Sequence, residues 1–342
     1  MKRTLCLMLA AVLSALFLIT CNVHEWPDER DSADLRLNLI YSTDWDMLEV
    51  PFQTRVPTKA MDVEVRYIVR AYPRTGSNRQ EHVYEQRFTR STAEGYDCSV
   101  DVTLPVGDYK IMVWSDFVLS GSNDHLHYNP ELFNGILLIS GDEHPANTDY
   151  RDAFRGTAEV LLESSFEVKP AVEVDIEMVR PLCKLQIIAT DLAEFIDKET
   201  KALSKVTTSV NGVLTPTKVD INDYTVKMYY TGYMPCAYNM FTDKPSDSKT
   251  GVYFESKITE LNEQEASLGF DYLFINGTGS STTVQLEVSS KDDKRVALSQ
   301  PIEIPLKRNQ HTLLIGKFLS TEAGGGIALN PEFAGDINLI LP

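Results

Sequence analysis

The histidines His125 and His127 come closest, by type and spacing, to a metal site. On a β-strand, residues i and i+2 point to the same face, so both imidazoles could bind one ion. No third ligand is evident, and the flanking stretch SGSNDHLHYNPE is typical of a solvated surface loop. Asp142, Glu143 and His144 form a second small polar cluster with the same interpretation. We therefore expect loops at both places, and neither a metal nor another cofactor.

The sequence carries none of the common signatures of catalysis. It has no Gly-x-Ser-x-Gly elbow, no His-Glu-x-x-His motif and no phosphate-binding loop. Acidic residues are abundant, with 49 Asp and Glu against 32 Lys and Arg for a formal charge of -17, but no pair stands out as acid and base. Such a charge repels phosphate backbones and argues against nucleic acid as a partner. We expect a protein that is not an enzyme.

The cysteines do not have the spacing of a zinc site. Outside the first 20 residues they are Cys21, Cys98, Cys183 and Cys236, without a Cys-x-x-Cys pair. If Cys21 carries a lipid, the other three form either one disulfide and one buried thiol or three buried free thiols. We favour the second arrangement, because free cysteine is often buried.

Aromatic side chains suggest a further type of site, a platform for binding sugars. The candidates are Tyr109, Trp114, Tyr224, Tyr229, Tyr230 and Tyr233. On alternating strands such residues more often pack in the core or across strands. The apolar neighbours of Trp114 favour its burial. The stretch YTVKMYYTGYMP (224–235) contains more tyrosines that could be exposed, although it is also consistent with ordinary sheet.

The N-terminus reads as an export signal that ends in a lipidation site. A basic start, MKR, precedes an apolar run over 5–20, which is typical of a secretory signal peptide. The run is shorter than the roughly 20 residues that a membrane-spanning helix needs. Its end, Leu18-Ile19-Thr20-Cys21, resembles the bacterial lipoprotein box, whose cysteine is acylated, for example with palmitate, and becomes the first residue. The alternative is a plain signal peptide with an incidental cysteine.

Lipidation at Cys21 predicts an outer-membrane, lipid-anchored protein exposed at the cell surface. More than one acyl chain holds a protein durably at a bilayer. Residues 21–33 would form an acidic tether, and loss of residues 1–20 would change the charge from -17 to -19. In this tether Asp31-Ser32-Ala33 resembles an O-glycosylation acceptor of some anaerobic Gram-negative bacteria, although so short a triplet also arises by chance. Ser32 is the candidate residue.

Short alternating segments dominate the rest of the chain. Period two over about five to eight residues marks half-buried strands. We expect them at 35–41, 63–70, 82–90, 100–104, 109–114, 172–178, 185–188, 206–211, 224–230, 252–259, 270–275, 282–289, 295–304, 311–319 and 336–341. Helix is expected only over 192–204, with a helical turn before a strand in 151–163. The pattern predicts a mainly β protein with two β-sandwich domains, 34–168 and 169–342.

Four segments together are similar to one family. They are LPVGDYKIMVWSDF (104–117), DIEMVRPLCKLQIIAT (175–190), IPLKRNQHTLLIGKFLS (304–320) and GGGIALNPEFAGDINLILP (324–342). They resemble fimbrillin-like proteins, the subunits and anchor lipoproteins of Bacteroides-type type V pili. In the second segment Arg180 precedes an apolar run with a lysine, as in that family. The resemblance spans both predicted domains.

The resemblance implies two tandem transthyretin-like domains with Greek-key character, other fimbrial subunits as partners, and assembly by donor-strand exchange. In stalk subunits of the family a protease cuts after an arginine near the start of the first domain. The candidates here are Arg30, Arg36 and Arg55. A cut after Arg30 leaves the strand at 35–41 whole, Arg36 lies inside that strand, and a cut after Arg55 removes it.

Two strands matter most for such assembly. Leu35, Leu37, Leu39 and Tyr41 would fill the groove of the chain itself, whereas Ile337, Leu339 and Leu341 would form its own last strand or enter a neighbour. For each strand the alternative is an ordinary sheet edge. The function we predict is a surface lipoprotein that serves as a pilus subunit or membrane anchor. The alternatives are an outer-membrane lipoprotein that binds a host or glycan ligand and a hydrolase with an unrecognised site.

Overall fold

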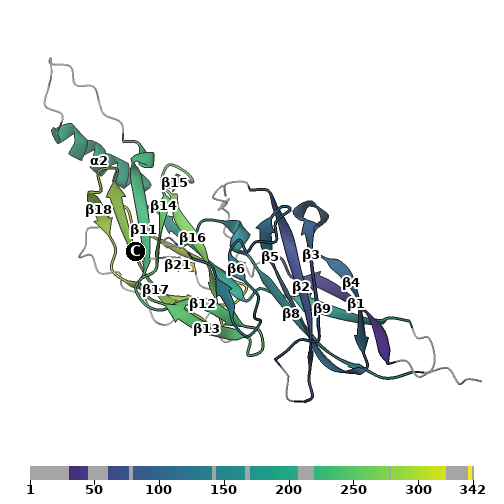
Figure 1. Cartoon of the computed structure of the whole chain (residues 1–342). Coiled ribbons are helices and arrows are strands. Elements are labelled where there is room, and N and C mark those ends of the chain that lie inside the picture. Colours follow the sequence, from purple (N-terminus) through teal and green to yellow (C-terminus); the bar gives the residue numbers. More distant parts are fainter. Residues whose placement is uncertain are drawn as a thin grey trace, which may run out of the picture.

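The computed structural model describes residues 31–44, 61–76, 80–140, 144–165, 170–206, 219–276, 279–320 and 338–340. These residues form a mainly β protein with a single α-helix among them, in two parts that lie side by side (Figure 1). The N-terminal part contains β1 to β9, and the C-terminal part contains β10 to β21. Within the described residues, no helix is both long and apolar enough to cross a membrane.

Two sheets enclose the core of the N-terminal part. The three-stranded sheet has the order β4 (Cys98–Pro105), β1 (Ser32–Tyr41) and β9 (Val172–Met178). The four-stranded sheet has the order β3 (Tyr84–Ser91), β2 (Val63–Pro73), β5 (Gly107–Leu119) and β8 (Phe154–Leu162). Apolar side chains of both sheets form one buried cluster. Burial of apolar surface of this kind is the main force that holds two sheets together.

A small sheet joins the two parts of the molecule. Its order is β13 (Lys244–Lys249), β12 (Met234–Asn239), β7 (Ile136–Leu138) and β6 (Tyr128–Asn129). The pairing of β7 with β12 therefore bonds a strand of the N-terminal part directly to one of the C-terminal part. Buried side chains from both parts, including Ile68 and Trp114, belong to a second apolar cluster that continues into the C-terminal part.

The C-terminal part contains two larger sheets. The first has the order β15 (Thr259–Glu260), β16 (Ala266–Phe274), β10 (Leu182–Ala189), β20 (His311–Gly316) and β21 (Asn338–Ile340). The second has the order β14 (Tyr253–Lys257), β11 (Tyr224–Tyr230), β17 (Ser280–Ser290) and β18 (Arg295–Leu298), with β19 (Ile302–Leu306) also paired to β17. The helix α2 (Leu192–Val206) and the 3-10 turns η1 (Thr92–Glu94), η2 (Asp149–Arg151) and η3 (Ile221–Asp223) complete the described elements.

A glycine permits the close approach of β8 to β9. A Cβ atom added at Gly156 would lie 2.5 Å from Ile176 Cγ2 and 2.5 Å from Met178 Sδ. Real Cβ atoms do not come so close to other heavy atoms, so a larger residue would push the two strands apart. The two strands belong to different sheets, and Gly156 thus helps to close the sandwich beside β1.

Most of the expected elements are confirmed. The strands at 35–41, 63–70, 100–104, 224–230 and 282–289 and the helix from 192 are present, with bounds that differ by a few residues. The strand expected at 206–211 is not among the described elements, because Val206 ends α2 and 207–211 lie outside the described residues. The sequence does not predict the short strands β6, β7, β12 and β13. In β12 the alternating pattern is broken by Pro235, and β13 consists of polar residues and a proline.

The division into domains stays a prediction, but one strand bears on it. The expected boundary at 168/169 falls in 166–169, outside the described residues, and assigns 172–178 to the second domain. In the structure β9 pairs in parallel with β1, in the sheet of the N-terminal part. This pairing favours a boundary beyond Met178. In addition, β1 begins at Ser32, inside the segment expected to be tether.

Candidate functional site

The first strand lies in a slot between two other strands. β1 pairs antiparallel with β4 on one side and parallel with β9 on the other. The side chains of Leu35, Leu37 and Leu39 are at most 1% exposed and pack in the core of the N-terminal part. The alternation read from the sequence explains this burial, because every second residue of a strand points to the same face. Without β1, the backbone edges of β4 and β9 and an apolar floor would be open.

The end of the strand is fixed by an aromatic residue. The backbone N–H of Tyr41 donates to Asp97 Oδ1 at 2.8 Å. Its half-buried ring lies edge-on to Phe154, with 5.0 Å between the ring centroids. Burial, with a smaller contribution from Tyr67, raises the pKa of Tyr41 well above its usual value. The phenol therefore stays neutral and acts as a packing group at the end of the slot.

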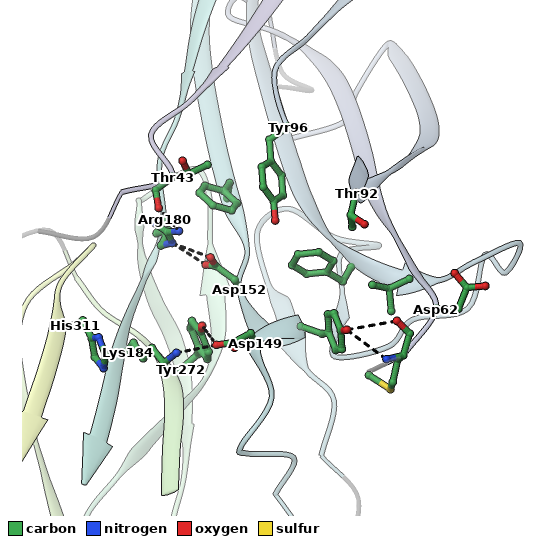
Figure 2. Close-up of a pocket in the computed structure, with 15 residues that line it drawn as sticks. Thr43, Asp62, Thr92, Tyr96, Asp149, Asp152, Arg180, Lys184, Tyr272 and His311 are labelled. Carbon is green, nitrogen blue, oxygen red and sulfur yellow. Dashed lines mark hydrogen bonds and ion pairs between the residues drawn. The ribbon is translucent and has the colours of Figure 1, made fainter. Parts of the chain in front are cut away.

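Arg180 holds the chain where it leaves the slot (Figure 2). Its Nη2 donates to the carbonyl of Thr43 at 2.7 Å, and its Nη1 donates to the carbonyls of residues 42 and 44 at 3.4 and 3.3 Å. Its Nε lies 2.9 Å from both carboxylate oxygens of Asp152, and Nη1 also donates to Asn309 Oδ1 at 2.9 Å. The guanidinium thus ties the exit of β1 to both parts of the molecule. We call this arrangement the Arg180 clamp.

A cleft of about 600 Å³ opens next to the clamp, between the two parts (Figure 2). Asp149 accepts from Lys184 Nζ at 2.7 Å and from the hydroxyl of Tyr272 at 2.8 Å. Burial raises the pKa of Asp152 to about 6, against the opposing effect of Arg180. At pH 7.5 the carboxylate is therefore ionised and paired, and its neutralisation below pH 6 would weaken the clamp.

A second polar cluster, completely buried, joins the two parts. Arg151 of η2 forms an ion pair with Asp271 of β16, and its Nη2 donates to the carbonyl of Tyr272 at 2.9 Å. The other carboxylate oxygen of Asp271 lies 2.7 Å from His144 Nε2 and 2.5 Å from the Tyr230 hydroxyl. Burial raises the pKa of Asp271, but Arg151 and His144 together hold this pKa below its usual value. We call these residues the Asp271 cluster.

The expectation that His144 lies in a solvated loop is wrong. Its side chain is 1% exposed and faces a buried carboxylate. The neighbouring candidates Asp142 and Glu143 lie outside the described residues. The polar residues between Gly141 and Pro145 are typical of a surface turn. Nothing in this stretch indicates that Asp271, more than 100 residues away in the chain, lies opposite His144.

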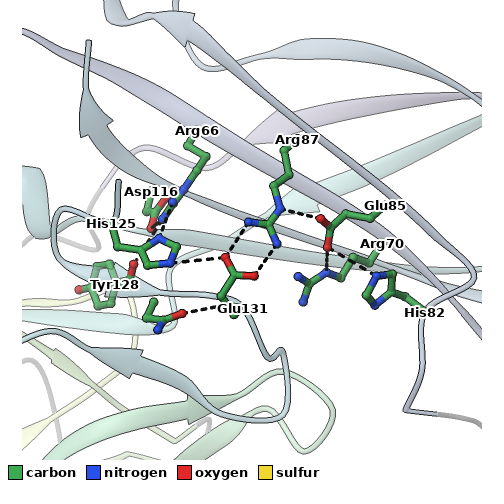
Figure 3. A network of polar contacts seen from close by, with 10 residues as sticks. Arg66, Arg70, His82, Glu85, Arg87, Asp116, His125, Tyr128 and Glu131 are labelled. Atoms are coloured by element: carbon green, nitrogen blue, oxygen red, sulfur yellow. Dashed lines mark hydrogen bonds and ion pairs between the residues drawn. The ribbon is translucent and has the colours of Figure 1, made fainter. Parts of the chain in front are cut away.

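His125 and His127, both expected in a solvated loop, lie in different surroundings, and the expectation is wrong for His127, which is buried. His125 belongs to a polar network at the sheet of β2, β3 and β5, where Nδ1 lies 2.8 Å from Arg66 Nη1 and Nε2 lies 3.4 Å from Glu131 Oε1 (Figure 3). Arg66 also pairs with the buried Asp116 at 2.6 Å. His127, by contrast, is 7% exposed. No group of three metal-ligating side chains occurs in the part of the chain that the structure describes.

The burial of His127 predicts a loss of stability in acid. Neither ring nitrogen has a hydrogen-bond partner among the described residues, and burial lowers the pKa of the imidazole to about 4. The unfolded chain takes up this proton near pH 6.5, so the stability present above that pH is lost as the pH falls toward 4. His127→Phe should reduce the fall in the free energy of unfolding between pH 7 and 4.5 by roughly 2–3 kcal/mol. Urea titrations at both pH values measure it.

The control for this prediction is His82→Phe, because His82 is exposed. That variant should retain the pH dependence of the original protein. An unchanged pH dependence in His127→Phe would show that the imidazole is not held neutral by its surroundings.

Most of the aromatic residues considered for a sugar platform do not lie at the surface. Tyr109, Trp114, Tyr224 and Tyr230 are buried, as the core interpretation predicts for aromatic residues on alternating strands. Tyr229 remains half-buried on the outer face of β11. Tyr233 is 74% exposed. The thiols of Cys98, Cys183 and Cys236 are free, with Cys98 half-buried and the other two buried.

Of the other predicted site residues, several lie outside the described part of the chain. These are Cys21, Arg30, Arg55, Ile337 and Leu341. Ser32 is exposed at the first position of β1. Leu339 lies in β21, which pairs in parallel with β20, so the structure places this segment in a sheet of its own chain. Acylation, glycosylation and cleavage at these positions stay predictions.

Sequence reasoning missed Asp152, Asn309, Arg151 and Asp271, and identified Arg180 only through the family pattern. One local signal existed for Asp271: it is a lone acid in the apolar strand LGFDYLF, where an ionised side chain needs a partner. The partner itself could not be found, because Arg151 is 120 residues away in the chain.

The fold and the slot define a class of mainly β proteins with a first strand held between two others. The chain belongs to the family described as "Family of unknown function (DUF6562)", whose model matches residues 29–342. None of the curated proteins compared with the chain matches it.

Three solved structures show how far the likeness extends. A crystal structure of putative polysaccharide binding proteins from Bacteroides thetaiotaomicron has 12% identity, covers 77% of this chain and 78% of its own, and gives a TM-score of 0.43. The fimbrial anchor protein Mfa2 from Porphyromonas gingivalis has 12% identity, covers 78% and 82%, and gives 0.42. The tip fimbrial protein Mfa3 from the same organism has 8% identity, covers 80% and 81%, and gives 0.39. Likenesses at these TM-scores carry no argument about function.

Proposed function

We propose that this chain is a non-enzymatic, fimbrial-type lipoprotein of the cell surface that assembles by β-strand addition. The observation that carries the proposal is the position of β1, bonded on both sides and with Leu35, Leu37 and Leu39 at most 1% exposed. A strand from another subunit could make the same backbone hydrogen bonds and cover the same apolar floor. The slot is then the site of assembly, and β1 is its first occupant.

The role of the protein depends on whether the chain is cut between β1 and β2. The strand β1 ends at Tyr41 and β2 begins at Val63, and Arg55 lies between them. A cut after Arg55 would free β1 together with the lipid on Cys21 and produce a polymerising subunit. Without the cut, the lipid stays attached through β1 and the protein is a membrane anchor.

Mass spectrometry of the N-terminus of the surface protein tests this proposal. An acylated Cys21 supports the anchor, and a new N-terminus at Val56 supports the polymerising subunit. An N-terminus that follows Arg30 or Arg36, or an unacylated N-terminus elsewhere before the end of β1, contradicts both roles. Cys21→Ala should leave the protein soluble in the periplasm, and membrane association of this variant would argue against the lipid anchor.

A further inference from the structure

The outer face of the slot carries charge, whereas its inner face is apolar. Arg36 of β1 stands directly between Asp101 of β4 and Glu173 of β9. Its Nε donates to Asp101 Oδ1 at 2.8 Å and its Nη2 donates to Asp101 Oδ2 at 3.1 Å, so the contact has two parallel hydrogen bonds. Two such bonds fix the direction of a guanidinium as well as its position.

The next outward position along β1 also has a partner on each side. Asn38 lies between Ser99 of β4 and Asp175 of β9. Its Nδ2 donates to Asp175 Oδ1 at 2.9 Å, and its Oδ1 accepts from Ser99 Oγ at 2.8 Å. Only a side chain that both donates and accepts, such as an amide, makes these two contacts together.

The two rims of the slot are acidic or neutral once β1 is set aside. The outward residues of β4 are Ser99, Asp101, Thr103 and Pro105, and those of β9 are Glu173, Asp175 and Glu177. The hydrogen bond to Asp101, and less strongly the charge of Glu173, raises the pKa of Arg36. Like charges directly opposite one another across strands are destabilising. An acidic residue at the position of Arg36 would therefore face two carboxylates.

We propose that the slot selects its strand by charge as well as by shape, and takes a strand with the pattern apolar–basic–apolar–amide–apolar from a different protein. The residues Leu35 to Leu39 of β1 have this pattern. The inference rests on the proposed function, because it concerns the strand that replaces β1. Each favourable ion pair at this exposed surface contributes little to binding. Selection therefore operates mainly by repulsion of strands that carry an acidic residue at the position of Arg36.

The strand expected at 336–341 does not have this pattern. No Lys or Arg follows Lys317. With Ile337, Leu339 and Leu341 in place of Leu35, Leu37 and Leu39, an amide would stand between Asp101 and Glu173. Moved by two residues, the same segment would bring Asp336 to that place. In either register, this segment of a second copy would leave both carboxylates without a cation, and β1 of that copy already lies in a slot of its own. The favoured partner is therefore another subunit.

The test uses the full chain with a specific protease site inserted after Arg55, cut so that both pieces stay together. Labelled peptides compete with the bound piece, and their binding is followed by fluorescence anisotropy. The peptides are residues 32–44, the same peptide with Arg36→Glu, and residues 330–342. We expect the first to bind about ten-fold more tightly than the other two. The peptide with Leu37→Asp is the matched control for shape and should not bind.

Three results separate the inference from the proposed function. If no peptide enters the slot, strand replacement itself is wrong. If residues 32–44, the same peptide with Arg36→Glu, and residues 330–342 all bind equally, strand replacement is supported and selection by charge is wrong. In a chain with Asp101→Lys and Glu173→Lys the preference should reverse, so that the Arg36→Glu peptide binds more tightly; an unchanged order contradicts the inference.

A measurement on the uncut chain gives an independent result. Arg36→Glu and Asp101→Lys should each speed hydrogen exchange of the β1 amides. The double variant should restore slow exchange in part, because Glu173 still faces the introduced carboxylate. Equal exchange in all four chains would show that the outward charges have no effect on the strand.

Discussion

Replacing Asp271 by alanine is expected to lower the free energy of unfolding by about 3–5 kcal/mol. The substitution leaves the guanidinium of Arg151, which is 1% exposed, in the core without its carboxylate. It also removes the acceptor of the Tyr230 hydroxyl and the partner of His144. A buried charge without a partner costs far more than the same change at the surface. Urea unfolding at pH 7.5, followed by tryptophan fluorescence, measures the loss.

The matched control is Asp101→Ala, since Asp101 also pairs with an arginine but its side chain is 70% exposed. Its effect on the free energy of unfolding should stay within about 0.5 kcal/mol. The double variant Arg151→Met with Asp271→Leu should recover much of the loss, because the buried charge is then gone. A single variant Asp271→Ala as stable as the control would show that the Asp271 cluster does not hold the two parts together.

Replacing Arg180 by methionine is expected to cost about 3 kcal/mol and to loosen the end of β1 in particular. Asp152 would remain half-buried at the junction without its cation, and the carbonyls of residues 42–44 would lose their donors. The guanidinium also lies over the ring of Phe154, with Cζ 4.6 Å from the ring centroid. Methionine is long and apolar but has no charge, so the effect reports mainly on charge and hydrogen bonding. Hydrogen exchange of peptides that cover 35–44, followed at pH 7.5, measures the local effect.

The comparison variant is Arg36→Met, which removes an exposed arginine from β1 itself. It should affect the global stability far less than Arg180→Met. Arg180→Lys should be intermediate, because lysine keeps the charge but lacks the planar fork that reaches Asp152 and the carbonyls together. If exchange in β11 and β17 rises as much as exchange in β1, Arg180 contributes to the whole fold and does not clamp the strand.

The alternating pattern of the sequence was enough to locate β1 and to assign its faces. Leu35, Leu37 and Leu39 read as one apolar face, and they are buried as expected. The same reasoning placed Trp114 in the core. It succeeded because the two faces of a strand depend only on the period of two along that strand. It failed at β12, where a register shift beside Pro235 interrupts the period.

The partners of each strand and of each buried charge were decided by the tertiary structure. The strand β9 lies beside β1 although Asn38 and Asp175 are 137 residues apart, and Asp271 meets Arg151 across 120. The residues of a short segment do not indicate which distant segment will pack against it, because strand pairing depends on the burial of the whole core. By itself, the sequence determined that β1 has an apolar face and an outward Arg36 and Asn38. Only the fold decided that Asp101, Glu173 and Asp175 border the slot and that Arg180 closes its end, because those contacts arise when remote strands come together over one core.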